Sequence, residues 1–147
     1  MDTDDVAGPD GPLWAELLDA KRYEPRTLSA RDLPTDKGVY IWVREGLPVY
    51  AGRAKGANGL RDRLSAHLAK GPDLSRSTFR SWVAVTILGV SRPVTRQRPS
   101  VMTDLQIQRV NDWVAGCRLG WITRPTSPQV IQFEHDLLDA WKPPLNR

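Results

Sequence analysis

The sequence predicts an α+β fold in which a small central antiparallel or mixed sheet of about three strands is flanked by helices. Residues 38–52, GVYIWVREGLPVYAG, contain two short apolar runs separated by a polar turn, which is typical of a β-hairpin. In residues 60–70, leucine recurs every four positions, which is typical of an amphipathic helix. At 147 residues, the chain is long enough for one domain with a two-layer core.

The N-terminal part is predicted to be a leader followed by one short helix. Residues 1–11 are rich in Asp, Gly and Pro, so we expect them to be flexible. The leucines and tryptophan of LWAELLDAK share one helical stripe, which predicts a helix from about Leu13 to Lys21. The sequence is therefore divided into an N-terminal leader and helix at 1–33 and a candidate functional domain at 34–147.

The middle of the chain is predicted to contain strands on both sides of a helix. Residues 39–43 and 49–52 are the two hairpin strands, rich in β-branched and aromatic residues. The helix over 60–70 ends at a Gly-Pro pair, which is a common stop signal. The run RSWVAVTIL at 80–88 is rich in β-branched residues and is predicted to be the third strand.

Capping signals predict two helices in the C-terminal part. Thr103 and Gln106 have the spacing of a capping box, and Ser127 with Pro128 suits an N-cap followed by a first-turn proline. The elements expected here are a basic, proline-containing loop at 91–100, a helix over 103–115, a short strand at 118–123 and a helix over 127–141.

The hairpin is predicted to bring its two tyrosines together. With the turn centred on Gly46, Tyr40 and Tyr50 become diagonal neighbours on one face of the sheet, and Gly52 leaves space beside them. The alternative is that tyrosine simply favours strands, and a register slip of one residue would separate the pair. The opposite face is expected to carry Val39, Ile41, Val43 and Val49 and to be the better core face.

Composition excludes several classes of protein. No apolar run approaches the length of a membrane span, and the acidic, polar N-terminus is unlike a secretory signal. We therefore expect a cytoplasmic protein that has no membrane partner. Cys117 is the only cysteine, which excludes an intrachain disulfide and a thiolate-rich zinc site, and it is expected to be a small core residue.

Positive charge is concentrated in the middle of the chain. The formal net charge is +4, but residues 53–98 contain ten Lys and Arg against two Asp, a net of +8. A basic segment between acidic ends is expected of a surface that binds a polyanion such as nucleic acid. The alternative is a solvated basic face without a partner. The candidate nucleic-acid contacts are Arg53, Lys55, Arg61, Arg76, Arg80, Arg92, Arg96 and Arg98.

The helix after the hairpin carries two polar residues on one face. Arg63 and His67 are four residues apart, on a face separate from the leucine stripe. Arg63 can donate two hydrogen bonds to a phosphate, and His67 can add a proton donor or another contact. The alternative is a surface arginine beside a histidine whose hydrogen bonds are satisfied within the fold.

The last helix places a carboxylate on its apolar stripe. Glu134 precedes Leu137, Leu138 and Trp141 by three, four and seven residues. A carboxylate that faces inward needs a partner, because burying an unpaired charge is costly. That partner is either an arginine in a salt bridge or a hard divalent cation that keeps most of its waters.

Together these residues resemble the GIY-YIG nuclease superfamily, which is named for two signature triplets. Here the triplets read GVY at 38–40 and YAG at 50–52. The resemblance continues through RLSAH, which contains Arg63 and His67, then Glu134, then PPLN, which contains Asn146, and it covers about residues 34–147. Val39 and Ala51 replace isoleucines, and the loop before Arg63 is longer than in compact members, so Arg61 is a competing assignment. Arg63 keeps the four-residue spacing to His67 and is preferred.

The resemblance implies catalytic roles for four residues that surround the scissile phosphate. Tyr40 would orient or deprotonate the attacking water, which requires a lowered phenol pKa or nearby cations. Tyr50 would support Tyr40 and contact the phosphate. Arg63 would balance the charge that grows in the transition state, and His67 would assist Arg63 or proton transfer.

The resemblance also implies one metal ion. Glu134 would hold a single Mg²⁺ or Mn²⁺ against the scissile phosphate, and Asn146 would orient the site through hydrogen bonds without taking part in the chemistry. The function expected is a metal-dependent endonuclease that hydrolyses nucleic acid, with DNA favoured over RNA.

Two other functions remain possible on the sequence alone. One is a nucleic-acid-binding module of the same fold that no longer cleaves, although the chain retains Tyr40, Arg63 and Glu134. The other is an interaction domain whose basic face docks an acidic protein. A homodimer or a partner protein is a further expectation, because family members often take specificity from an attached domain.

Overall fold

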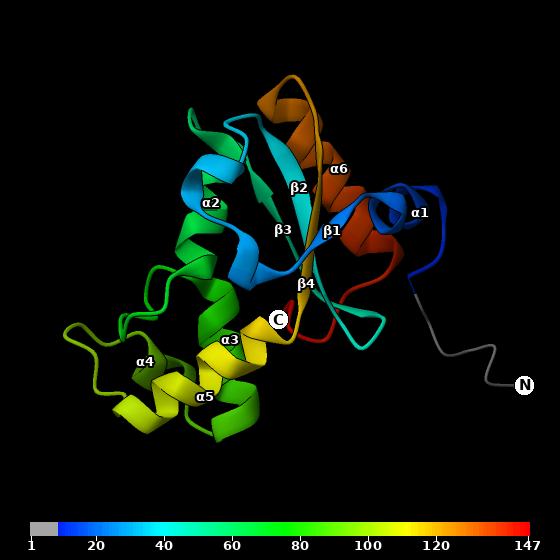
Figure 1. The fold of residues 1–147 in the computed structure, drawn as a ribbon. Coiled ribbons are helices and arrows are strands. Elements are labelled where there is room, and N and C mark those ends of the chain that lie inside the picture. Colours follow the sequence, from blue (N-terminus) through cyan, green and yellow to red (C-terminus); the bar gives the residue numbers. More distant parts are fainter. Residues whose placement is uncertain (1–8) are drawn as a thin grey trace, which may run out of the picture.

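The fold is built on one four-stranded antiparallel sheet. The computed structural model describes residues 9–147, so the predicted leader lies largely outside the described residues. The sheet order is β1-β4-β2-β3 (Figure 1). The predicted α+β class is confirmed, with one more strand than expected. The strands are β1 Arg22–Tyr23, β2 Gly38–Arg44, β3 Leu47–Ala54 and β4 Arg118–Thr123.

Helices cover both faces of the sheet, so the fold has three layers (Figure 1). Two short 3₁₀ helices, Pro25–Thr27 and Ala30–Asp32, connect β1 to the hairpin. Among the described residues the α-helices are α1 Pro12–Asp19, α2 Gly59–Leu68, α3 Thr78–Leu88, α4 Arg92–Thr95, α5 Asp104–Ala115 and α6 Ser127–Ala140.

Two apolar clusters fill the spaces between these layers. On one face Val39 and Ile41 pack with residues of α1 and α6, and the indole of Trp14 donates a 3.0 Å hydrogen bond to the carbonyl oxygen of Leu137. On the other face Tyr40 packs with residues of α2, α3 and α5 in a larger cluster. The prediction that the valine face is the better core face is therefore wrong, because helices cover both faces and the larger cluster lies on the tyrosine face.

The hairpin register agrees with the prediction over most of its length. Tyr40 lies opposite Gly52 and Trp42 lies opposite Tyr50, as expected for a turn centred on Gly46. A register shift after Trp42 then places Val49 in the same cluster as Tyr50. The prediction that Val49 faces the other way is wrong, because the bulge adds a residue to one strand and changes the alternation.

Residues 80–88 form most of α3, so the prediction of a strand there is wrong. The Ser77 side chain accepts a hydrogen bond from the backbone N–H of Arg80 and caps the start of the helix, and Gly89 ends it at φ 70°. The β-branched residues of this run favour strands in isolation, but Phe79 and Val83 pack into the larger cluster. Tertiary packing therefore overrides the local preference.

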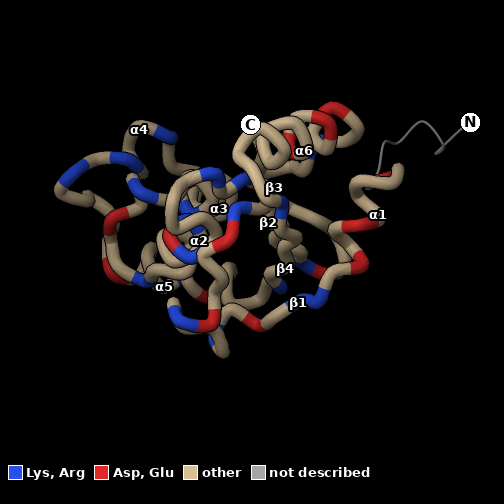
Figure 2. The backbone as a smooth tube through the Cα atoms, turned by 90° about the horizontal axis from the view of Figure 1, so that it is seen from above, with Lys and Arg blue, Asp and Glu red and all other residues tan. Residues whose placement is uncertain are grey.

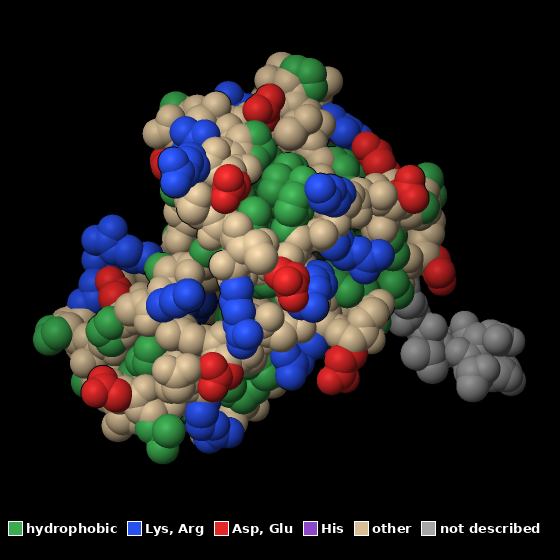
Figure 3. All heavy atoms as spheres, in the orientation of Figure 1, with side chains coloured by type: hydrophobic (Ala, Val, Ile, Leu, Met, Phe, Trp, Pro, Cys, Tyr) green, Lys and Arg blue, Asp and Glu red, His purple; other side chains and the backbone are tan. Residues whose placement is uncertain are grey.

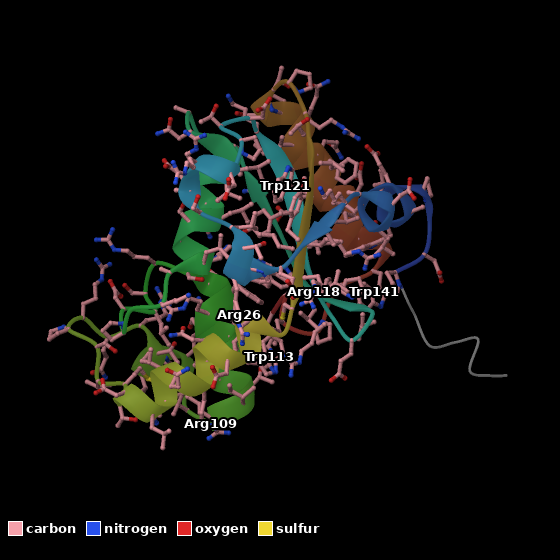
Figure 4. The ribbon with its side chains drawn as sticks, in the orientation of Figure 1. Arg26, Arg109, Trp113, Arg118, Trp121 and Trp141 are labelled. Carbon is pink, nitrogen blue, oxygen red and sulfur yellow. The ribbon has the colours of Figure 1, made fainter. Side chains whose placement is uncertain are left out.

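The remaining elements largely match the sequence. The predicted capping box of Thr103 and Gln106 begins α5, whereas the N-cap of α6 is Thr126 and not Ser127. The predicted basic loop at 91–100 contains the short helix α4. Figure 4 labels Trp113 on α5, which packs against the larger cluster, and the Arg44 guanidinium lies 4.5 Å from the centre of its ring.

Arg80 is buried in the helical layer and does not face solvent. It is 1% exposed, and one nitrogen of its guanidinium donates to the carbonyl of Gly71 at 2.8 Å and to the side chain of Asn111 at 2.9 Å. Burial lowers its pKa to about 10. The prediction of Arg80 as a nucleic-acid contact is wrong, because its side chain holds together the loop after α2 and helix α5.

Replacing Arg80 with alanine is expected to destabilise the fold by about 2–4 kcal/mol, because it leaves a cavity and two unpaired acceptors in the helical layer. Thermal melting measures the change, with the exposed Arg76→Ala as a matched control that loses the same charge. An Arg80→Ala protein with the melting temperature of the wild type would show that these hydrogen bonds do not contribute to the stability of the fold.

Candidate active site

The centre of the candidate site is the tyrosine pair of the hairpin. The ring centres of Tyr40 and Tyr50 are 6.5 Å apart, so the predicted neighbours do lie together. Tyr40 packs directly over the backbone of Gly52 on the adjacent strand. A Cβ atom at position 52 would lie 2.5 Å from the Cζ atom of Tyr40, so only glycine leaves room for this ring.

Helix α2 is anchored beside the start of β2. The backbone N–H groups of Leu60 and Arg61 donate 2.9 Å hydrogen bonds to the carbonyls of Asp36 and Pro34, which satisfies two free donors of the first turn. Gly59 allows this approach, because its φ is +46° and a side chain there would clash with the carbonyl of Asp36. The anchoring directs one face of α2 toward the tyrosines.

His67 lies behind Tyr40 and is completely buried. Its Nε2 atom is 2.7 Å from the Tyr40 hydroxyl, and its Nδ1 atom is 2.6 Å from the Ser77 hydroxyl. The ring of Phe79 packs edge-on at 5.8 Å. Burial, together with the charges of Arg63 and Arg80, lowers the pKa of His67 to about 3, so the imidazole is neutral at physiological pH.

The two tyrosines are protonated in the free protein. Burial raises the pKa of Tyr40 strongly and raises that of Tyr50, because a phenolate loses its hydration in this site. The guanidinium of Arg63 opposes both shifts, whereas the carboxylate of Glu134 reinforces them. Arg63 is therefore the side chain that most favours a phenolate at Tyr40.

Glu134 faces the same site from α6 and is paired with an arginine. Its carboxylate accepts a 3.2 Å hydrogen bond from Arg53 of β3, and 16% of its side chain is exposed. Burial raises the pKa of Glu134, and Arg53 and Arg63 oppose the rise. Of the two partners considered from sequence, the arginine is the one present, and the carboxylate still faces the pocket described next.

An open pocket of about 600 Å³ brings these residues together. His67 is not among the lining residues, because it lies behind the Tyr40 ring. Most of the predicted site therefore converges on one concave surface between α2, β3 and α6. The polar residues that line it are Tyr40, Tyr50, Arg53, Lys55, Asp62, Arg63 and Glu134.

Asn146 supports the site from outside the pocket. Its side chain accepts a 2.8 Å hydrogen bond from the backbone N–H of Ala51 and donates one of 2.7 Å to the carbonyl of the same residue. Ala51 lies between Tyr50 and Gly52, so this pair of bonds holds the strand that carries the second tyrosine. The contact agrees with the orienting role that the resemblance implies.

The comparisons with known proteins identify the family. Residues 38–147, most of the chain, match the model of the GIY-YIG catalytic domain. This chain belongs to the GIY-YIG family. Searches of curated proteins and of solved structures found no match. The GIY-YIG domain supports a nuclease-type function, with nucleic acid as the substrate, and GIY-YIG nucleases are generally metal-dependent.

The donor set of this GIY-YIG domain suits one hydrated cation. No group of three or more His, Cys, Asp or Glu within residues 9–147 could hold a metal ion. Glu134 lines the open pocket together with Tyr40, Tyr50 and one other carboxylate, that of the exposed Asp62. Mg²⁺ is often bound through one or two carboxylates while it keeps several waters, so Glu134 fits this kind of site.

The predicted basic contacts of the GIY-YIG domain fall into three groups. Arg53 and Lys55 line the pocket, whereas Arg61 donates to the carbonyl of Leu33 and helps to anchor α2. Arg92 stacks 4.5 Å from the ring of Trp82. Figure 2 shows blue segments gathered around α4, and Figure 3 shows basic side chains that project on this side. Arg76, Arg96 and Arg98 are exposed outside the pocket, and Lys55 is exposed where it lines the pocket.

Sequence reasoning missed two residues at the site. Asp62 lines the pocket, but an exposed acid within a basic segment gave no reason to select it. Ser77 contacts His67, but a strand predicted over residues 80–88 gives Ser77 no role as the N-cap of a helix. The signal was available, since Ser77 and Gly89 are spaced as the N-cap and the C-terminal glycine of one helix.

Gly52→Ala is expected to lower the cleavage rate roughly 100-fold, because the added methyl group displaces Tyr40 and small misplacements in an active site have effects of this size. Gly56→Ala is the matched control, since Gly56 lines the same pocket and a Cβ there meets nothing within 4 Å. Single-turnover rates measure the effect. Equal rates for the two variants would contradict the role given to this close approach.

Proposed function

We propose that this GIY-YIG domain is a divalent-metal-dependent endonuclease that hydrolyses phosphodiester bonds of nucleic acid, with DNA as its preferred substrate. The observation that carries the proposal is the convergence of Tyr40, Arg63 and Glu134, from three different elements, on one pocket. A binding module has no need to gather a phenol, a guanidinium and a carboxylate in one concave site. Arginine and lysine side chains around the pocket suit a phosphate backbone.

Tyr40 is the proposed acceptor of the water proton. In hydrolysis the water oxygen bonds to phosphorus, the bond from phosphorus to the leaving oxygen breaks, and the water loses a proton. Tyr40 can take this proton only as a phenolate. Because burial raises the pKa of Tyr40, the phenolate requires added positive charge in the substrate complex, and the Tyr40 proton leaves to solvent through the open pocket before the phenolate accepts one from the attacking water.

Arg63 and Tyr50 are proposed to hold the phosphate. Arg63 lines the pocket beside Tyr40, where a guanidinium stabilises the negative charge that grows on the phosphate oxygens. The Tyr50 hydroxyl can donate to the same group. Both side chains need to be placed before the substrate arrives, and α2 and β3 are each anchored by backbone hydrogen bonds.

Glu134 is the proposed ligand of the divalent cation. A divalent cation bound there would supply positive charge that stabilises the leaving oxygen and favours loss of the Tyr40 proton. Arg53 now neutralises the carboxylate and would compete with a cation for it. Released from Glu134, Arg53 could contact a phosphate at the pocket rim.

We also propose the cellular compartment and the partners of the enzyme. No helix among residues 9–147 has the length and apolar character needed to cross a membrane. We infer action on nucleic acid in the cytoplasm. A homodimer or a partner protein that supplies specificity stays a prediction, as does the division of the chain at residue 34.

Cleavage is tested by incubating the full chain with labelled duplex, branched and single-stranded DNA and RNA, each with Mg²⁺, Mn²⁺ or EDTA. Denaturing gels are expected to show internal cuts, greater on DNA, that require the metal. Binding without cleavage of any substrate would favour the inactive nucleic-acid-binding module. Displacement from nucleic acid by an acidic protein alone would favour the interaction domain.

Glu134→Ala is expected to abolish metal-dependent cleavage and to leave nucleic-acid binding in place, because the substitution removes the proposed ligand but no phosphate contact. Tyr40→Phe keeps the ring and is expected to lower the rate by at least roughly 100-fold, the scale seen when one catalytic donor is removed. Single-turnover rates and melting temperatures are measured for both. A Glu134→Ala enzyme that cuts at the wild-type rate would show that the metal ligand lies elsewhere.

The double variant Arg96→Ala/Arg98→Ala is expected to reduce the slope of log affinity against log salt by up to about 1.8 on duplex DNA, since each lost phosphate contact removes about 0.9. The control is Arg26→Ala/Arg109→Ala, which removes the same charge from two exposed arginines that are labelled in Figure 4 and are not among the predicted nucleic-acid contacts. Affinity is measured by fluorescence anisotropy over a salt series. Equal slopes for the two variants would mean that the segment after α4 does not contact the nucleic acid.

A further inference from the structure

We propose that Ser77 is a positioning residue of this active site, and that its hydroxyl holds His67 in the tautomer that carries its proton on Nε2. His67 then donates a hydrogen bond to the oxygen of Tyr40 and does not accept one from it. The tautomer follows from the hydrogen bonds of the buried side chains and from the neutral state of His67. The consequence for catalysis rests on the proposed role of Tyr40.

Three buried side chains form a continuous hydrogen-bonded chain. The Tyr40 hydroxyl contacts Nε2 of His67 at 2.7 Å, and Nδ1 of His67 contacts the Ser77 hydroxyl at 2.6 Å. Tyr40 and Ser77 are each 1% exposed, and His67 is 0% exposed. His67 and Ser77 do not line the pocket, so their donors and acceptors must find partners within the protein, whereas the Tyr40 hydroxyl borders the pocket and can donate into it.

The proton of the Ser77 hydroxyl decides the direction of this chain. The hydroxyl oxygen already accepts a 3.0 Å hydrogen bond from the backbone N–H of Arg80 at the start of α3. A hydroxyl has one proton to donate, and His67 Nδ1 is the acceptor that the described residues place within reach of Ser77. If Nδ1 carried a proton instead, the Ser77 oxygen would accept from both Nδ1 and the Arg80 N–H, and the described residues would leave the Ser77 proton buried without an acceptor. Ser77 therefore donates to Nδ1.

A neutral imidazole carries one proton, so a bare Nδ1 requires the proton on Nε2. The low pKa of His67 keeps its imidazole neutral, because burial and the charges of Arg63 and Arg80 oppose the binding of a second proton. The Nε2–H group then donates to the Tyr40 oxygen. This arrangement makes His67 a donor to Tyr40 and excludes it as the base that removes the Tyr40 proton.

The donated hydrogen bond prepares Tyr40 for its proposed role. A hydrogen bond to the phenol oxygen favours the phenolate over the phenol, as does the charge of Arg63 on the pocket side. Tyr50 and Glu134 face Tyr40 from β3 and α6 and disfavour the phenolate. The proton of Tyr40 points toward the pocket, since the side toward His67 is occupied by the Nε2–H group.

The tautomer is tested directly by long-range ¹H–¹⁵N NMR on the ¹⁵N-labelled full chain. The chain contains two histidines, and His135 is exposed, so its nitrogens provide an internal reference. We expect His67 to show a protonated Nε2 and a bare Nδ1. A protonated Nδ1, or averaging over both tautomers, would overturn the proposal. No substrate is needed, so this result stands apart from any failure to find cleavage.

Variants of Ser77 test its effect on the reaction. Ser77→Ala is expected to alter the His67 nitrogen shifts and to lower kcat roughly tenfold, the factor that corresponds to one ordinary hydrogen bond, with KM unchanged. Ser77→Thr keeps the hydroxyl and the N-cap. This variant is expected to have the wild-type His67 nitrogen shifts and the wild-type kcat. Thr103→Ala removes the N-cap of α5 and controls for the loss of helix stability.

The outcomes separate a positioning role from a structural one. A Ser77→Ala protein with wild-type kcat and unchanged His67 shifts would contradict the proposal. A loss of kcat in Thr103→Ala equal to that in Ser77→Ala would also contradict it. If Ser77→Ala does not fold, the wild-type tautomer and the kcat of Ser77→Thr decide. If the wild-type chain cleaves no substrate, the proposed function fails, while the tautomer is still confirmed or refuted by NMR.

Discussion

Tyr40 and His67 are joined by a 2.7 Å hydrogen bond that ties the central sheet to the helical layer above it. Because both side chains are buried, water cannot replace either partner, and the bond holds β2 and α2 at one separation. It depends on the space that Gly52 leaves beside the Tyr40 ring. It also depends on α2 beginning at Gly59, close against the carbonyl of Asp36. The pocket opens where these constraints meet.

Charge in the pocket is balanced locally. Glu134 is largely buried, and its carboxylate is neutralised by Arg53 from the adjacent strand. A phosphate entering beside Glu134 would add negative charge in a partly desolvated site, where charges interact more strongly than in water. Arg63, Lys55 and a divalent cation are the groups that would offset it. The same charges explain why Tyr40 is a phenol in the free protein and a candidate phenolate in the complex.

Local signals predicted the elements that they specify directly. The hairpin register up to Trp42 followed from alternation about a turn centred on Gly46, and the capping box at Thr103 marked the start of α5. Strand β1 and helix α3 were missed for opposite reasons. Strand β1 is too short to show a period and exists because it pairs with β4, whereas α3 contains β-branched residues that packing holds in a helix.

The sequence by itself determined the family and the chemical types at the site, because the motif residues fall at intervals that hairpin and helix geometry convert into shared faces. It determined that Glu134 needs a partner, but not that Arg53 is that partner. Only the tertiary structure decided that Arg80 is buried and that Ser77 reaches His67. The physical reason is that burial and hydrogen-bond partners depend on contacts between elements distant in the chain, which no local pattern encodes.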